Sequence, residues 1–176
     1  MKTMYIIDFE ASSLSRASYP IEVAWGRTPD AVISYLLNPE KMAGWTDWNT
    51  KSFELHHISR NLLIKKGEDP RRVAARMVQE LAGEAVYSDE PQFDTLWKDR
   101  LLTDTGHDPG LIRIKNLKYY LNKIIKIHCP GKRYMDLFQE FSTAKSVCHR
   151  AGKDVIWLMD FVAFIRNLPE PPPKQK

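Results

Sequence analysis

The sequence predicts a single α/β domain, because three strand-like segments come first and helical and strand-like segments then alternate. Residues 4–10, 21–26 and 31–37 are rich in the side chains typical of strands, and a short turn joins the second to the third. Short turns join antiparallel neighbours, so these strands are expected to form an antiparallel meander. With 176 residues, 43% of them apolar, the chain is long enough for one core and too short for two ordinary domains.

The middle of the chain first loses this regularity and then becomes helical. Residues 38–67 contain Pro, Gly and scattered aromatics, so a long surface excursion with a short helix or two is expected. A clear helix follows, because Asp69 can cap it, Pro70 occupies the favoured first position and apolar residues recur at helical spacing up to Leu81.

The second half of the chain is expected to alternate strands and helices until a proline-rich end. The expected elements are a strand at 85–87, a helix that begins near Pro91, a strand at 112–114, helices at 117–127 and 134–148, and a last helix that begins near Asp154. The folded domain is expected to span residues 1–167. Residues 168–176 are rich in proline and charge, and are expected to form a disordered tail.

The first predicted strand ends in Asp8 and Glu10. Side chains two residues apart project from the same face of a strand, so these carboxylates are expected side by side. Their charges repel each other, and a divalent cation is the usual partner that makes such a pair tolerable. A strand that becomes polar where it leaves the core would give the same triplet, so the pattern alone leaves both interpretations open.

Later segments supply further acids and a histidine. Asp94 is expected in the first turn of its helix, where the helix dipole also favours an ordinary acid. Asp154 shares a helical face with the apolar residues at offsets four, seven and eleven, so it is expected on a buried stripe. His149 lies five residues before Asp154, on the turn that leads into this helix. Taken singly, each of the three could be a surface or capping residue.

Taken together, these positions resemble the DEDDh family of 3′–5′ exonucleases, which includes the proofreading subunit of bacterial replicative polymerases, ribonuclease T and oligoribonuclease. The resemblance covers about residues 3–166, almost the whole chain. The motifs that carry it are the strand Ile-Ile-Asp-Phe-Glu that holds Asp8 and Glu10, Glu22-Val23-Ala24-Trp25, the pair Phe93-Asp94, and His149 separated by four residues from Asp154.

The resemblance implies a ribonuclease H-like fold: a central mixed five-stranded sheet with three antiparallel strands and helices on both faces. It also implies two Mg²⁺ or Mn²⁺ ions held by Asp8, Glu10, Asp94 and Asp154, with His149 as general base. Two ions roughly 3.5 to 4 Å apart stabilise both the attacking and the leaving oxygens of a phosphoryl displacement. A histidine with an ordinary pKa near about 6.5 can accept the proton of the attacking water.

The implied activity is hydrolysis of phosphodiester bonds at the 3′ ends of single-stranded DNA or RNA, with release of 5′-mononucleotides. Similar enzymes often follow the first Glu with Thr-Thr-Gly or Thr-Ser-Gly, and this chain departs from that pattern with Ala11-Ser12-Ser13-Leu14. Position 11 therefore offers no hydroxyl, whereas backbone contacts to the terminal nucleotide and a wedge from Leu14 remain expected; a core leucine is the alternative for Leu14. The expected substrate-binding residues are Phe9, Ala11, Ser12 and Leu14.

Positive charge is concentrated late in the chain, whose formal net charge is +4. Between Pro109 and Met135 there is no acid, while lysines and arginines alternate with tyrosines, a mixture suited to phosphates and bases of a single strand. A solvated helix face is the alternative, and His56 and His57 are expected to be a surface pair. The basic residues of this interval are Arg113, Lys115, Lys118, Lys123, Lys126, Lys132 and Arg133.

The remaining expectations concern compartment and partners. No apolar run approaches the roughly 18 residues of a membrane span, and two cysteines, Cys129 and Cys148, fit a reducing compartment, so a cytoplasmic protein is expected. Two alternatives stay open beside the exonuclease. One is a nucleic-acid-binding or polymerase-associated module with little catalysis, and the other is an exoribonuclease that processes RNA as a homodimer.

Overall fold

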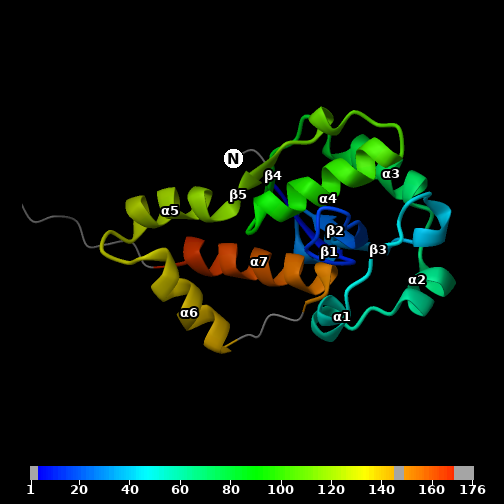
Figure 1. Cartoon of the computed structure of the whole chain (residues 1–176). Helices are drawn as coiled ribbons and strands as arrows, with labels where there is room; N and C mark the ends of the chain where they lie inside the picture. The colour runs from blue at the N-terminus through cyan, green and yellow to red at the C-terminus, as the bar shows by residue number, and fades with distance from the viewer. Residues whose placement is uncertain (1–3, 145–148, 169–176) are drawn as a thin grey trace, which may run out of the picture.

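A five-stranded mixed sheet forms the centre of the molecule, in the order β3-β2-β1-β4-β5 (Figure 1). The structure, a computed structural model, describes residues 4–144 and 149–168. The predicted tail from residue 169 and the end of the predicted helix 134–148, with Cys148, lie outside the described residues. The strands are β1 (Tyr5–Ala11), β2 (Pro20–Gly26), β3 (Ile33–Leu36), β4 (Val86–Ser88) and β5 (Ile114–Asn116).

Strand pairing confirms the predicted sheet. Strands β1, β2 and β3 pair antiparallel, while β1–β4 and β4–β5 pair parallel. Glu10 pairs with Glu22 across β1 and β2, and the register then shifts between Glu10 and Ala11. Such irregularities re-aim the side chains at the end of a strand. Because β1, β4 and β5 run in the same direction, the residues at their carboxyl ends meet along one edge of the sheet.

Helices cover both faces of the sheet, as predicted (Figure 1). One face packs against α3 and α4, with α1 and α2 beside them, and the other packs against α7 and α5, with α6 at the far end. The helices are α1 (Thr50–His56), α2 (Arg60–Lys66), α3 (Pro70–Leu81), α4 (Pro91–Asp104), α5 (Leu117–His128), α6 (Tyr134–Ala144) and α7 (Ala151–Arg166).

The alternation of β1 decides where its carboxylates point. Ile7 and Phe9 lie in the core on the α4 side, while Ile6 lies in the core on the α7 side. Since successive side chains of a strand alternate between faces, Asp8 and Glu10 project to the same side as Ile6. The two acids therefore face the layer that holds α7.

Two sequence predictions about these segments differ from the structure. Residues 38–67 do form two short helices, but this segment is not confined to the surface, because Trp45, Ile58 and Leu63 are fully buried in the core. The last strand lies at Ile114–Asn116 instead of 112–114, because Ile112 packs into the core before the strand begins. Over the described part of the chain, none of the helices combines the length and apolarity that crossing a membrane requires.

Candidate active site

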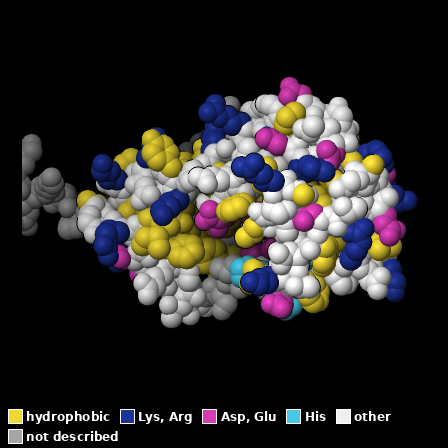
Figure 2. Space-filling model, viewed as in Figure 1, with side chains coloured by type: hydrophobic (Ala, Val, Ile, Leu, Met, Phe, Trp, Pro, Cys, Tyr) yellow, Lys and Arg dark blue, Asp and Glu magenta, His cyan; other side chains and the backbone are white. Residues whose placement is uncertain are grey.

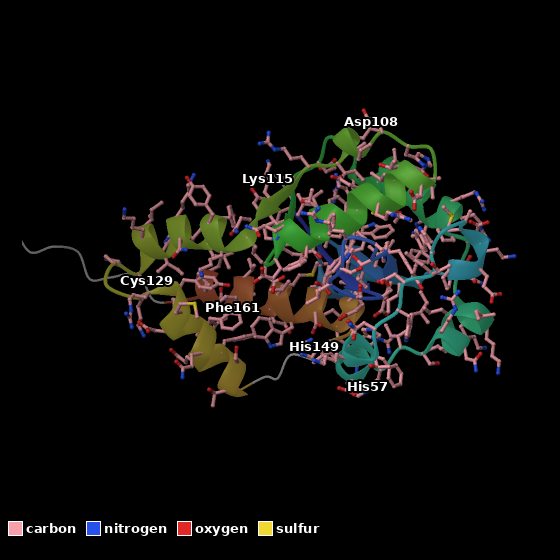
Figure 3. All side chains as sticks on the ribbon, viewed as in Figure 1. His57, Asp108, Lys115, Cys129, His149 and Phe161 are labelled. Atoms are coloured by element: carbon pink, nitrogen blue, oxygen red, sulfur yellow. The ribbon has the colours of Figure 1, made fainter. Side chains whose placement is uncertain are left out.

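Acidic side chains from four separate segments converge at the carboxyl edge of the parallel strands. Figure 2 shows acidic side chains and a histidine gathered in a recess in the middle of one face, and Figure 3 places His149 at the N-terminal end of α7. Their ligand atoms form two groups, each with all atoms within 4.8 Å of one another. We call Asp8, Asp89 and Asp94 the inner cluster and Glu10, His149 and Asp154 the outer cluster.

The inner cluster joins the sheet to the first turn of α4. Asp89 directly follows β4, and Asp94 lies four residues into the helix segment, with a side chain only 1% exposed. Within the described residues, Asp94 Oδ2 is buried and has no hydrogen-bond partner. A buried carboxylate oxygen without a donor is costly unless a cation or a proton compensates it.

Burial and mutual repulsion govern the electrostatics of the inner cluster. Burial raises the pKa of Asp8 well above its ordinary value, and the charges of Asp94 and Asp89 raise this pKa further. Burial likewise raises the pKa of Asp94, and the charge of Asp89 adds to the effect, while the neighbouring Ser88 hydroxyl and the backbone of Phe9 oppose it. Each negative charge disfavours the ionisation of the neighbouring carboxyl groups. In the metal-free protein the protonated forms of these groups are therefore favoured.

The outer cluster is more open to solvent. Glu10 and Asp154 are half-buried and His149 is exposed. Burial raises the pKa of Glu10 to about 8, with the charges of Asp154 and Glu22 adding to the rise and Arg150 opposing it. A cation placed between Glu10 and Asp154 would lower the pKa of Glu10 and favour its ionised form.

Buried Glu22 fastens the outer cluster to the sheet. Its carboxylate accepts hydrogen bonds from Arg150 Nε and Nη2, at 3.0 and 2.9 Å, and from the backbone N–H of Ala151, at 3.1 Å. Ser34 Oγ donates to the same carboxylate at 3.0 Å. The fork of Arg150 meets the carboxylate in a bidentate pair, which fixes orientation as well as distance. The start of α7, and His149 before it, are thereby tied to β2.

His149 has an unfavourable backbone conformation that contacts of the neighbouring residues must stabilise. Its φ of 48° lies in the left-handed region, which is unfavourable for a residue with a side chain. The next residue is fixed on both sides: the backbone N–H of Arg150 donates to Asp154 Oδ2 at 3.1 Å, while its side chain binds Glu22. This arrangement sets the direction of His149 relative to Asp154.

The residues after Glu10 are less accessible than a substrate contact through their side chains would require. Phe9, Ala11 and Ser12 are buried, and Ser12 Oγ accepts a hydrogen bond from the backbone N–H of Tyr19 at 3.1 Å. Any contact of these three with a nucleotide is limited to backbone groups, and Ser12 N–H already donates to Tyr19 O. Leu14 is 70% exposed, so the alternative of a core leucine is wrong and its wedge role stays a prediction.

His56 was expected at the surface, and this prediction is wrong. Its side chain is 3% exposed, because α1 ends there and the chain turns through His57, whose φ of 55° is left-handed. His56 Nδ1 accepts a hydrogen bond from the Ile58 N–H at 3.0 Å. Burial lowers the pKa of His56 to about 4, so the ring is neutral at physiological pH and its Nε2–H faces the interior.

The sequence did not predict the roles that two residues of the site have in the structure. Asp89 stands alone in sequence between a short strand and a proline, and the signal that could have identified it is an acid placed directly after a strand. Glu22 was part of the family motif, but its binding to Arg150 spans 128 positions and no local pattern predicts it.

The donor set fits hard divalent cations. Five carboxylates and one imidazole gather within the two clusters, and oxygen-rich sites of this kind suit Mg²⁺ or Mn²⁺ better than thiolate-preferring metals. The unpartnered oxygen of Asp94 supplies a direct reason for a cation in the inner cluster.

The chain matches no protein-family model and no curated protein sequence. Its fold, however, matches solved structures of exonuclease I. The exonuclease I of Methylocaldum szegediense superposes with a TM-score of 0.72 at 14% identity, covering 96% of this chain and 41% of that protein. The zinc-bound complex of E. coli exonuclease I with single-stranded DNA gives a TM-score of 0.69 at 14% identity, covering 94% of this chain and 40% of that protein.

These similarities show the fold. The fold is ribonuclease H-like, and these two matches to exonuclease I cover 94% and 96% of this chain. It spans about two-fifths of the length of those proteins.

Proposed function

We propose that this protein is a metal-dependent 3′–5′ exonuclease that acts on single-stranded nucleic acid. The observation that carries the proposal is the meeting of the two clusters at one edge of the sheet, from residues that lie as far apart in sequence as Asp8 and Asp154. The likeness in fold to a protein solved with a dT13 oligonucleotide and with its product supports the same activity.

The residues divide into those that hold cations and one that handles the proton. Asp8 and Asp94 would hold a divalent ion in the inner cluster, and Glu10 and Asp154 would hold one in the outer cluster. When bound, such ions lower the pKa of water and stabilise the charge of a phosphoryl displacement. A ring nitrogen of His149 would accept the proton of the attacking water, because this side chain is exposed and lies within the outer cluster, beside Glu10 and Asp154.

The terminal nucleotide would lie over the end of β1. Phe9 and Ala11 flank Glu10 along β1, Leu14 follows with an exposed side chain, and similar enzymes use the corresponding stretch for the 3′ nucleotide. The expected products are 5′-mononucleotides.

Digestion of matched single-stranded DNA and RNA oligonucleotides, each with a free or a blocked 3′ end, tests the proposal. With Mn²⁺, the free oligonucleotides should shorten from the 3′ end and release 5′-mononucleotides, while blocked ends and EDTA should both prevent the reaction. Internal cleavage, or cleavage that ignores the block, would contradict the proposal. Tight binding without hydrolysis would favour a binding module, and a mass measurement in solution decides whether the active form is a dimer.

A further inference from the structure

Asp89 is an acid of the site that lies outside the four-carboxylate pattern. It stands between Ser88, the last residue of β4, and Glu90, the residue before the first residue of α4. Ser88 is fully buried and pairs with Asn116 of β5, so the backbone that leads into Asp89 is fixed by the sheet. Asp89 itself is half-buried and turned toward Asp8 and Asp94.

The position of Asp89 does not suit an ordinary helix cap. The N-cap residue of α4 is Glu90, and its side chain makes no capping hydrogen bond. Asp89 lies one residue before the cap. A ligand atom of Asp89 instead lies within 4.8 Å of ligand atoms of Asp8 and Asp94, so three carboxylates share one small volume.

The inner cluster also contains a buried atom that requires a partner. Asp94 Oδ2 makes no hydrogen bond to any described residue, and the Asp94 side chain is 1% exposed. The structure therefore offers three carboxylates, one of which is almost completely buried and has an oxygen without a hydrogen-bond partner. One divalent ion between them would compensate this buried carboxylate and offset two of the three formal negative charges.

We infer that Asp89 is a third carboxylate ligand, with Asp8 and Asp94, for a divalent cation of the Mg²⁺ or Mn²⁺ class. The inference rests on the proposed function, which assigns this ion to Asp8 and Asp94 alone. It makes the inner cluster a site with three acidic ligands, whereas the outer cluster has two acids and a histidine.

Calorimetric titration with Mn²⁺ tests the inference without any need for activity. The parent protein should bind two ions. Asp89→Asn should weaken one of them by about tenfold or more, a loss typical of changes around a metal site, and leave the other unchanged. Asp89→Ala removes any residual amide oxygen and should weaken the same ion at least as much.

Glu90→Gln is the matched control, because Glu90 is the adjacent acid and contributes to the same electrostatic field without belonging to the cluster. It should leave both affinities within about threefold of the parent, a change below 1 kcal/mol. Equal losses in Glu90→Gln and Asp89→Asn would overturn the inference, because a general field effect would then explain both.

Melting temperatures in EDTA and in Mn²⁺ provide a second measurement on the same variants. Asp89→Asn relieves repulsion, so its metal-free melting temperature should equal or exceed that of the parent, and its rise on addition of Mn²⁺ should be smaller. A parent that binds no Mn²⁺ would overturn the metal-dependent proposal itself. A parent that binds two ions, with Asp89→Asn and Asp89→Ala both identical to it, would overturn only the role of Asp89.

Discussion

The inner and outer clusters both bring carboxylates close together, but they differ in burial and in the groups that surround them. In the inner cluster, Asp94 is almost completely buried and lies close to two other acids, so the ionised site is electrostatically unfavourable without a cation. In the outer cluster, exposed His149 lies beside a helix start that Glu22 holds through Arg150. On the proposed function, we expect cation affinity to depend mainly on the inner cluster and the alignment of the proton acceptor to depend on the outer one.

Replacement of His149 should give the largest effect and sharpen this division. His149→Ala should reduce turnover by roughly 100-fold or more, because a positioned base typically contributes that much. Mn²⁺ binding measured by calorimetry should remain close to that of the parent. A variant without affinity for Mn²⁺ would show that His149 is a metal ligand and that the division of roles is wrong.

Removal of the tether should affect alignment without removing any ligand. Glu22→Gln loses the charged partner of Arg150, and a displaced His149 should reduce turnover by about tenfold while KM changes little. Because the Arg150 side chain is 38% exposed, the decrease in unfolding free energy should be limited to about 1–2 kcal/mol.

Asp136→Asn provides the control, since it breaks the ion pair of Arg133 and Asp136 on the exposed surface of α6. Because both side chains are exposed to solvent, this change should leave stability and turnover close to those of the parent. If Glu22→Gln changed stability but not turnover, Glu22 would be a purely structural residue.

The stability of the metal-free protein should depend on pH, and this is the next largest effect expected. Carboxyls whose pKa is raised in the folded state stabilise the fold at low pH, and this stability is lost as the pH rises through the folded pKa. For Glu10 the window runs from its ordinary value of 4.5 to about 8. In EDTA the melting temperature should therefore fall between pH 5 and pH 9, by at least about 4 °C for a chain of this size.

Asp94→Asn should weaken this pH dependence and raise the metal-free melting temperature at pH 8, because it removes one charge from the inner cluster. The rise caused by Mn²⁺ should shrink in the same variant. A melting temperature that rises with pH in EDTA, or an Mn²⁺ response equal to that of the parent, would show that Asp94 is an ordinary helix-start acid.

The smallest effects are expected from the lysines outside both clusters. Lys118 lies with its ammonium 5.4 Å from the ring of Tyr134, and the pKa of Tyr134 is raised to about 12 by burial together with the charges of Asp89 and Glu90. Lys115, seen on β5 in Figure 3, and Lys123 line a cavity of about 420 Å³ together with three tyrosines.

Replacement of Lys115, Lys118, Lys123 and Lys126 by Gln should weaken the binding of a single-stranded oligonucleotide at every sequence tested. The slope of log affinity against log salt should fall by about 0.7 for each phosphate that the protein no longer neutralises. Lys65 and Lys66, at the end of α2, serve as the control pair and should leave the slope unchanged. An unchanged slope after all four replacements would show that these lysines are only solvated surface residues.

The sequence by itself determined the elements whose signals are local. The alternation in β1 placed Asp8 and Glu10 on one face, and the capped start at Asp69 with apolar spacing up to Leu81 identified α3. The short turn between the second and third strands predicted that they pair antiparallel. The mixed five-stranded sheet, and the grouping of Asp94, His149 and Asp154 with the first strand, were expected from the family resemblance, which the order and spacing of the motifs carried.

Only the tertiary structure decided the contacts between distant segments. Asp89 joins the inner cluster because β4 runs parallel to β1 and ends at the same edge, a fact that the residues around Asp89 do not encode. Glu22 binds the start of α7 because β2 and α7 pack together, and His56 is buried where α1 ends, with its ring against Trp48. Burial and like-charge repulsion, which set the pKa of Glu10 and Asp94, arise only when these segments have met.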